Sequence, residues 1–144
     1  MLFRSLARRA AIRQEYESAL ALSVAALEKE PGLVRDRQRE VGYMAAGLAL
    51  WLSTTLPEEQ QGRKTELRDR AWGWLRQELD HWKNAGPEWQ VARRAALMRW
   101  RFDPSLAAVS RPERREQLPA DEQERWRALW DEAAQVAESG SPSP

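Results

Sequence analysis

The chain has 144 residues, no cysteine and an almost balanced charge, with 23 lysines and arginines against 22 aspartates and glutamates. The lack of cysteine excludes disulfides, thiolate metal sites and a cysteine nucleophile, and the near-zero net charge excludes a strong field that attracts nucleic acid or membrane surfaces. The longest apolar run, residues 44–52, is too short to span a bilayer. Residues 1–13 lack the apolar core and the cleavage site of a signal peptide, and we expect a cytoplasmic protein.

Apolar residues recur at helical spacing along almost the whole sequence, and no segment alternates as a strand does. A first helix is predicted up to Arg13, followed by a break at Gln14–Glu15 and a second helix over 16–29. Pro31-Gly32 ends that second helix. Further helices are predicted over 34–53, 66–83, 88–101 and 104–109, with a polar loop over 54–64 between the first two. A last helix is predicted after Leu118-Pro119. The pattern predicts an all-α protein.

Two local signals mark helix starts in the C-terminal part of the sequence. Asp103-Pro104 combines a good N-cap residue with a proline in the first turn, which predicts the short helix that ends near Val109. Ser110 to Glu113 has the spacing of a capping box and predicts another short turn. Residues 139–144 are small, polar and rich in proline and serine, so we expect a disordered tail.

The spacing of apolar and small residues in the first part of the chain carries a family resemblance. The residues concerned are Phe3, Leu6, Ala7, Tyr16, Ala19, Ala26, Leu27 and Pro31. Their spacing resembles that of a tetratricopeptide repeat, although Gln14 stands where the family has its turn glycine. The resemblance implies a short array of about two α-hairpins with a cap, in a single domain over 1–138. Repeat one covers 1–31, a looser repeat two covers 40–83, and a helical cap covers 88–138.

A second resemblance covers about residues 40–138. It rests on Trp74, Leu75, Leu79, Trp82, Asp103, Pro104, Leu106, Val109, Leu118, Pro119, Trp126, Leu129 and Trp130. These residues look like the C-terminal end of repeat arrays in large bacterial proteins of the planctomycete type, many of which have a serine/threonine kinase domain ahead of the array. The chain has no glycine-rich loop and no catalytic-loop signature of a kinase. The resemblance therefore implies a terminal repeat with a helical cap and no catalysis.

No group of residues has the pattern of an active site. His81 is the only histidine, and because its nearest acid points elsewhere on the helix, we interpret it as a solvated or packed side chain. The acid clusters Glu58-Glu59, Asp121–Glu124 and Asp131-Glu132 fall in a predicted loop, a first helical turn and a solvent-facing stripe, where acids need no catalytic role. We therefore predict no enzyme activity, no metal and no cofactor.

The sequence has eight tryptophans, an unusual number for one small protein. Most of those on regular apolar stripes, among them Trp82, Trp126 and Trp130, are predicted to lie in the core. Three others fit the stripes less regularly, and we expect them in a groove or an interface. These three are Trp51, Trp72 and Trp89.

The first predicted helix contains four arginines and no acid, and it defines a candidate binding surface. Arg4 and Arg8 lie one turn apart, on the side of the first helix that lines the concave groove of a tetratricopeptide superhelix, alongside Ile12. Arg35 and Arg39 begin the next inner helix and extend the same surface. Guanidinium groups in such a groove would clamp a carboxylate-bearing peptide. The alternative is a solvated basic face that pairs with glutamates of the same hairpin.

These patterns favour a non-enzymatic adaptor that binds a protein or an acidic peptide through the groove of its inner helices. The predicted contact residues are Arg4, Arg8, Ile12, Arg35, Arg39, Trp51, Trp72 and Trp89. Because the sequence begins inside a repeat, we also expect a partner or a second copy to cover Leu2, Phe3 and Leu6, through self-association of the N-terminal hairpin. The alternative is a nucleic-acid-binding accessory protein that uses the arginine clusters and exposed tryptophans, which the near-neutral charge disfavours.

Overall fold

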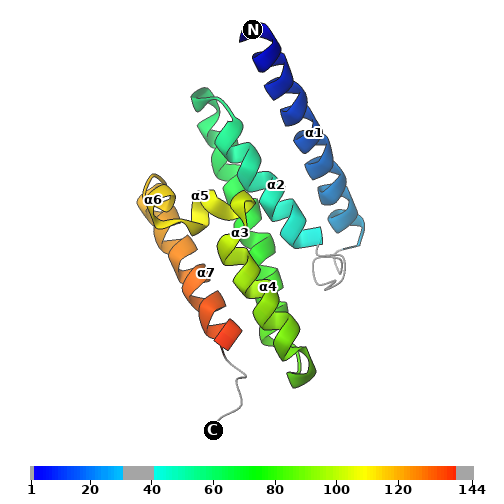
Figure 1. Cartoon of the computed structure of the whole chain (residues 1–144), viewed down its shortest axis with the longest axis vertical. Helices are drawn as coiled ribbons and strands as arrows, with labels where there is room; N and C mark the ends of the chain where they lie inside the picture. Colours follow the sequence, from blue (N-terminus) through cyan, green and yellow to red (C-terminus); the bar gives the residue numbers. More distant parts are fainter. Residues whose placement is uncertain (1, 31–40, 139–144) are drawn as a thin grey trace. The chain divides into compact units, whose positions relative to one another are not determined.

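The computed structural model of the chain describes residues 2–30 and 41–138, with side chains from residue 7 onward. All regular secondary structure in these ranges is helical (Figure 1), so the all-α prediction is confirmed. The chain forms two compact units, with the boundary between Trp74 and Leu75 inside helix α3. None of the helices in the described ranges is both long and apolar enough to cross a bilayer.

The first unit begins with α1, a single helix over Leu2–Lys29. The break predicted at Gln14–Glu15 is therefore wrong, and residues 2–29 do not fold back as the hairpin of a repeat. The physical reason is local: glutamine and glutamate are good helix formers, and α1 contains neither glycine nor proline to stop it. The spacing of small residues that resembles a repeat persists, but nothing in the segment makes a turn.

Helix α1 packs against α2, which covers Val41–Thr55. Tyr16 of α1 stacks on Trp51 of α2 with ring centroids 4.0 Å apart and an interplanar angle of 21°, and Leu20 and Leu27 of α1 are buried. Helix α2 is apolar on nearly all sides, and Ala45, Ala46, Ala49, Leu50 and Leu52 have no exposed surface. It is the central helix of the first unit because its small residues allow close approach of its neighbours.

The link from α2 to α3 is shorter than the polar loop predicted over residues 54–64. A 3₁₀ turn, η2, covers Glu58–Gln60, and α3 follows directly over Gln61–Lys83. Gly62 is helical and lies in the exposed first turn of α3, where a Cβ atom would meet no neighbouring atom, so no close packing requires a glycine there. Leu67 and Ala71 of α3 are buried in the first unit.

The second unit consists of the end of α3 and a series of shorter helices. These are η3 (Pro87–Trp89), α4 (Gln90–Phe102), η4 (Pro104–Leu106), α5 (Ala107–Ser110), α6 (Pro112–Arg115) and α7 (Ala120–Glu138). Trp100, Leu106, Val109, Trp126 and Leu129 are almost completely buried and form its core. Contacts join α4 to α7 and α5 to both α6 and α7.

Two polar side chains fix the helix ends of the second unit. Asp103 accepts hydrogen bonds from the backbone nitrogen of Ser105 at 2.9 Å and from its hydroxyl at 2.7 Å, which confirms the predicted N-cap. The capping box predicted at Ser110 is wrong, because Arg111 is the N-cap of α6 and makes no side-chain cap bond. Arg93 is buried and donates to the carbonyl oxygens of Trp82 and Ala85, both at 3.1 Å, so it caps the C-terminus of α3.

Candidate functional site

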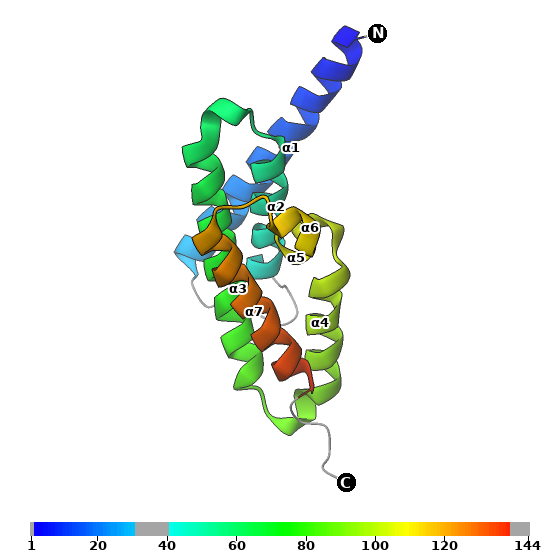
Figure 2. The ribbon, with the colours of Figure 1, turned by 90° about the vertical axis from the view of Figure 1, so that its left-hand side faces the viewer.

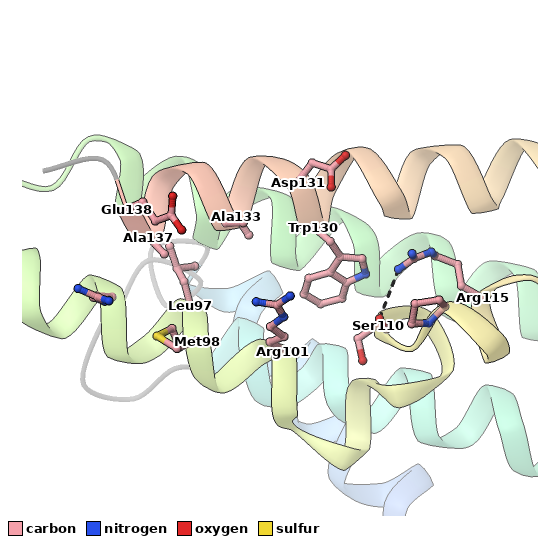
Figure 3. A pocket seen from close by; sticks show the side chains of 13 residues that line it. Leu97, Met98, Arg101, Ser110, Arg115, Trp130, Asp131, Ala133, Ala137 and Glu138 are labelled. Atoms are coloured by element: carbon pink, nitrogen blue, oxygen red, sulfur yellow. Dashed lines mark hydrogen bonds between the residues drawn. The ribbon is translucent and has the colours of Figure 1, made fainter. Parts of the chain in front are cut away.

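Helices α4 and α7 lie side by side in the second unit and leave a groove of about 350 Å³ between their outer faces (Figure 3). The α4 side is a helical stripe of Arg94, Leu97, Met98 and Arg101. The α7 side is a second stripe, made by Trp130, Asp131, Ala133, Ala134, Ala137 and Glu138. In the close-up, Leu97 lies near Ala137, and Arg101 lies near Trp130, so the two helices run antiparallel along the groove.

The floor of the groove is apolar because α7 presents alanines toward α4. Leu97 and Ala133 are buried, Ala137 is half-buried, and Ala134 is exposed. Met98 on the α4 side keeps 44% of its surface exposed although it faces the groove. An alanine contributes a single side-chain carbon, so no side chain of α7 fills the space beside Leu97 and Met98. The groove is therefore open to an apolar side chain from outside.

Trp130 forms the wall at one end of the groove. Its ring stacks on Trp126, with centroids 6.2 Å apart and an angle of 23°, and meets Trp100 edge-on at 6.3 Å and 83°. Its Nε1 donates a hydrogen bond of 2.7 Å to the carbonyl oxygen of Val109. The half-buried indole is thus fixed in orientation by α4, α5 and α7, and it gives the groove a rigid aromatic surface.

Helices α5 and α6 close the same end of the groove. One terminal nitrogen of Arg115 donates to the carbonyl oxygens of Val109 at 3.2 Å and Ser110 at 3.3 Å, and Figure 3 shows the contact with Ser110. This arginine therefore satisfies carbonyl groups at the C-terminus of α5 and holds α6 in place. Its role at the groove is structural.

Charged side chains stand on both rims of the groove. On the α4 rim, Arg94 and Arg101 are exposed and seven residues apart, and on the α7 rim Asp131 and Glu138 are exposed with the same spacing. Seven residues of α-helix rise about 10 Å, or two turns. Within the described ranges, none of these four side chains has a hydrogen-bond or ion-pair partner. The rims are therefore oppositely charged and available to a ligand.

The first unit has a hollow of similar volume, about 350 Å³, between α1 and α3. Its floor is formed by Leu20, Ala21, Val24, Ala25 and Leu67. An ion pair of 2.5 Å between Arg63 and Glu17 already joins its two sides. This hollow resembles the α4–α7 groove in its apolar floor, but it lacks an aromatic wall and is bridged by the chain itself.

The residues predicted as the binding surface are spread over both units. Arg8 is exposed on α1 and Ile12 is half-buried one turn later, while Trp51 is half-buried with one face against Tyr16. Trp72 belongs to the first unit and Trp89 to the second, both half-buried and both with contacts to other residues. Arg35 and Arg39 lie outside the described residues, and the side chain of Arg4 is not described.

The arginines and the tryptophan that line the groove do not stand out as a binding site in the sequence. In the sequence, Arg93, Arg94 and Arg101 form one basic cluster, whereas in the structure Arg93 is buried against the end of α3 and the other two lie on the rim. Trp130 was predicted in the core, yet it is half-buried and lines the groove, while Trp126 one turn earlier is fully buried. The sequence signal that points to the groove is the i, i+3, i+4, i+7 spacing of Arg94, Leu97, Met98 and Arg101, which places these four residues on one face of a helix.

The electrostatics of the second unit are dominated by an ion-pair network that has a structural role. Glu132 of α7 accepts two hydrogen bonds from Arg76, one of them 2.9 Å long, and a third from Lys83 at 2.7 Å. Arg76 also donates a hydrogen bond to Asp80. Hydrogen bonds from Arg76, then from Lys83, lower the pKa of Glu132 from 4.5 to about 2. The predicted solvent-facing role of Glu132 is wrong, because it ties α7 to the C-terminal part of α3.

Among the described residues, no group of three or more histidines, cysteines and acids is placed to hold a metal ion. Of the two hollows described above, the α4–α7 groove has the more complete set of ligand-binding features: an apolar floor, a fixed aromatic wall and unpaired charges. Comparison with protein-family models, with curated proteins and with solved structures finds no match to this chain.

Proposed function

We propose that the chain is a non-enzymatic adaptor that binds an amphipathic α-helical segment of a partner protein in the α4–α7 groove. One observation supports this most directly: an apolar floor, with Met98 44% exposed, runs between two rims of unpaired and opposite charge. Apolar surface framed by polar residues in this way is typical of protein-binding sites.

A helix fits the groove better than an extended peptide. Two antiparallel helices that each present an i, i+3, i+4, i+7 stripe offer ridges and grooves to a third helix, and alanines on the floor allow its axis to approach within about 8–10 Å. Large apolar side chains of the ligand would then enter beside Leu97 and Met98. Their expected spacing on the ligand is i, i+3 or i+4, and i+7.

The charges on the rims define the ligand further. Arg94 and Arg101 are two turns apart, so a ligand helix with acids seven residues apart on one edge can meet both arginines. Its opposite edge would carry lysines or arginines that face Asp131 and Glu138. Because the groove is only about two turns long and its ion pairs are solvent-exposed, we expect an affinity in roughly the micromolar range.

A nucleic-acid ligand agrees less well with the groove. Arg94 and Arg101 would bind phosphates, but Asp131 and Glu138 on the facing rim repel them. The ring of Trp130 is already covered by Trp126 on one face and met by Trp100, so it is not free to stack between bases. Binding to single-stranded oligonucleotides is therefore expected to be weak and steeply reduced by salt.

The test uses a synthetic helical peptide with leucines at i, i+4 and i+7, glutamates seven apart on one edge and lysines on the other. Fluorescence anisotropy should give a micromolar Kd for the unaltered chain and at least a tenfold weaker one for Arg94→Glu/Arg101→Glu. Arg111→Glu/Arg114→Glu changes the net charge equally on exposed residues of the same unit that do not line the groove, and it should bind as the unaltered chain does.

A second peptide, with lysines in place of the glutamates, should bind Arg94→Glu/Arg101→Glu more tightly than the unaltered chain, since the charge pairing is then restored. Equal affinities of both peptides for both proteins would contradict the proposal. So would an equal loss of affinity in Arg111→Glu/Arg114→Glu, because the effect would then come from net charge alone.

A further inference from the structure

The outer face of the N-terminal part of α1 carries a stripe of mostly small residues that no other helix of the first unit covers. It consists of Ala7, Ala11, Gln14 and Ser18, all exposed and alternately four and three residues apart. We call this stripe the α1 seam. The opposite face of the helix packs on α2 through Leu20, Leu27 and the stack of Tyr16 on Trp51. The spacing of the seam is that of the contact positions of a coiled coil.

Helix α1 also extends past the rest of the first unit. Trp51 lies opposite Tyr16 and α2 ends at Thr55, so the first turns of α1 have no helix of the first unit beside them, as Figure 2 shows. Residues 7–11 are all exposed. A helical segment of this length without tertiary packing is marginal in water, and a partner along the seam would stabilise it.

The charge of α1 is divided between its two halves. Residues 2–13 contain four arginines and no acid, whereas residues 14–24 contain two glutamates, Glu15 and Glu17, and no basic residue. If two copies of this helix lie antiparallel, the basic half of each lies beside the acidic half of the other. A parallel pair brings like charges together, which is unfavourable. The charge pattern is therefore complementary to itself in one orientation only.

We propose that two copies of the chain associate through their α1 seams in an antiparallel, two-fold symmetric pair. In the register that fits best, the two-fold axis passes between residues 12 and 13 of each helix. Ala7 then lies opposite Ser18 of the second copy, and Ala11 lies opposite its Gln14. The small side chains allow the two helices to approach closely.

This register also pairs the charges that flank the seam. Arg8 directly follows Ala7 of the seam, and Glu15 directly follows Gln14. Arg8 of each copy lies beside Glu15 of the other copy, so this ion pair forms twice. Both are exposed and have no partner within the described residues. Leu22, which is 73% exposed on the same edge, lies against the first turn of the second α1 and loses part of that exposure.

Sedimentation equilibrium over a range of concentrations tests the charge pairing. The unaltered chain should form a dimer, and Arg8→Glu or Glu15→Arg alone should weaken it at least tenfold. The double variant Arg8→Glu/Glu15→Arg restores opposite charges and should recover the dimer. Arg9→Glu is the matched control, because it makes the same charge change on an exposed residue of the same overhang but away from the seam; it should leave the dimer unchanged.

Three results would overturn the proposal: a monomer at all concentrations, a loss of dimer in Arg9→Glu as large as in Arg8→Glu, or no recovery in the double variant. Circular dichroism of each variant shows that the helix content is retained. These results do not depend on peptide binding by the α4–α7 groove, which is measured separately.

Orientation is tested with engineered cysteines, because the chain has none of its own. An equimolar mixture of Ala7→Cys and Ser18→Cys should form a disulfide between the two variants under mild oxidation, and each variant alone should form little. A parallel pair gives the reverse result, since each cysteine then faces its own copy. Self-crosslinking of each single variant with no mixed product would therefore contradict the antiparallel register.

Discussion

Trp130 of α7 donates a hydrogen bond of 2.7 Å from its indole nitrogen to the carbonyl oxygen of Val109 in α5. The same carbonyl accepts a hydrogen bond from Arg115 of α6 at 3.2 Å. One backbone oxygen therefore joins three helices at the closed end of the groove. Because the bonds fix the indole ring, the aromatic wall of the proposed binding site exists before any ligand arrives, which lowers the entropic cost of binding.

Trp130→Phe removes the indole hydrogen bond while keeping an aromatic ring. We expect the free energy of unfolding to fall by about 1–2 kcal/mol, measured by urea denaturation, because a hydrogen bond is lost and the wall is packed less well. The affinity for the helical peptide should fall as well. An unchanged stability together with unchanged affinity would show that the wall has neither role.

Ala137→Leu places a large side chain on the floor of the groove. Since the groove is open there and Ala137 is only half-buried, the thermal midpoint should stay the same or rise, while the Kd for the peptide should increase at least tenfold. Ala128→Leu is the control, because Ala128 is exposed on α7 away from the groove. Peptide binding that survives Ala137→Leu would place the ligand elsewhere.

Arg93 and Arg94 are neighbours in sequence with opposite expected effects. Arg93→Ala leaves the carbonyl oxygens of Trp82 and Ala85 without this donor in a buried region, so the free energy of unfolding should fall by about 2–3 kcal/mol. Arg94→Ala changes an exposed side chain and should shift stability by no more than about 0.5 kcal/mol. Only Arg94→Ala should weaken peptide binding without affecting stability.

The ion pairs of Glu132 predict a pH dependence of stability. Its pKa is lowered in the folded chain from 4.5 to about 2, so the stabilisation it supplies is complete above pH 4.5 and is lost as the pH falls toward 2. Glu132→Gln should therefore be less stable than the unaltered chain by about 1 kcal/mol at neutral pH, and the two should converge toward pH 2.

The control for this prediction is Glu124→Gln, which breaks the exposed pair with Arg127. That substitution should change the free energy of unfolding by only a few tenths of a kcal/mol at any pH, because both partners are solvated. If the difference between Glu132→Gln and the unaltered chain were the same at pH 2 and pH 7, the role assigned to the network would be wrong.

The sequence was most informative where a single residue type decides the local backbone. Asp103-Pro104 gave the correct helix start, and the helix predicted over 66–83 ends at the same residue as α3. The break at Gln14–Glu15 failed because it rested on the spacing of distant residues, while the residues at the break themselves favour a helix. Local signals were therefore more dependable than resemblance in this segment.

The groove was not predictable from the sequence, since it depends on which face of α7 meets α4. Trp126 and Trp130 are one turn apart and look equivalent in the sequence, but the first is fully buried and the second lies at the edge of the groove. Likewise, Glu122 stands in the first turn of α7, where an acid is expected in solvent, yet it is 4% exposed. Such differences arise from tertiary packing between segments far apart in the chain.

The most direct test of the central claim is a titration of the isotope-labelled chain with the helical peptide, followed by amide and indole NMR signals. The proposed function predicts that the largest shifts fall on residues 94–101 and 130–138, together with the indole N–H signal of Trp130. If the peptide binds but the shifted signals lie outside these two stripes, or if no signal shifts at millimolar peptide, the α4–α7 groove is not the binding site.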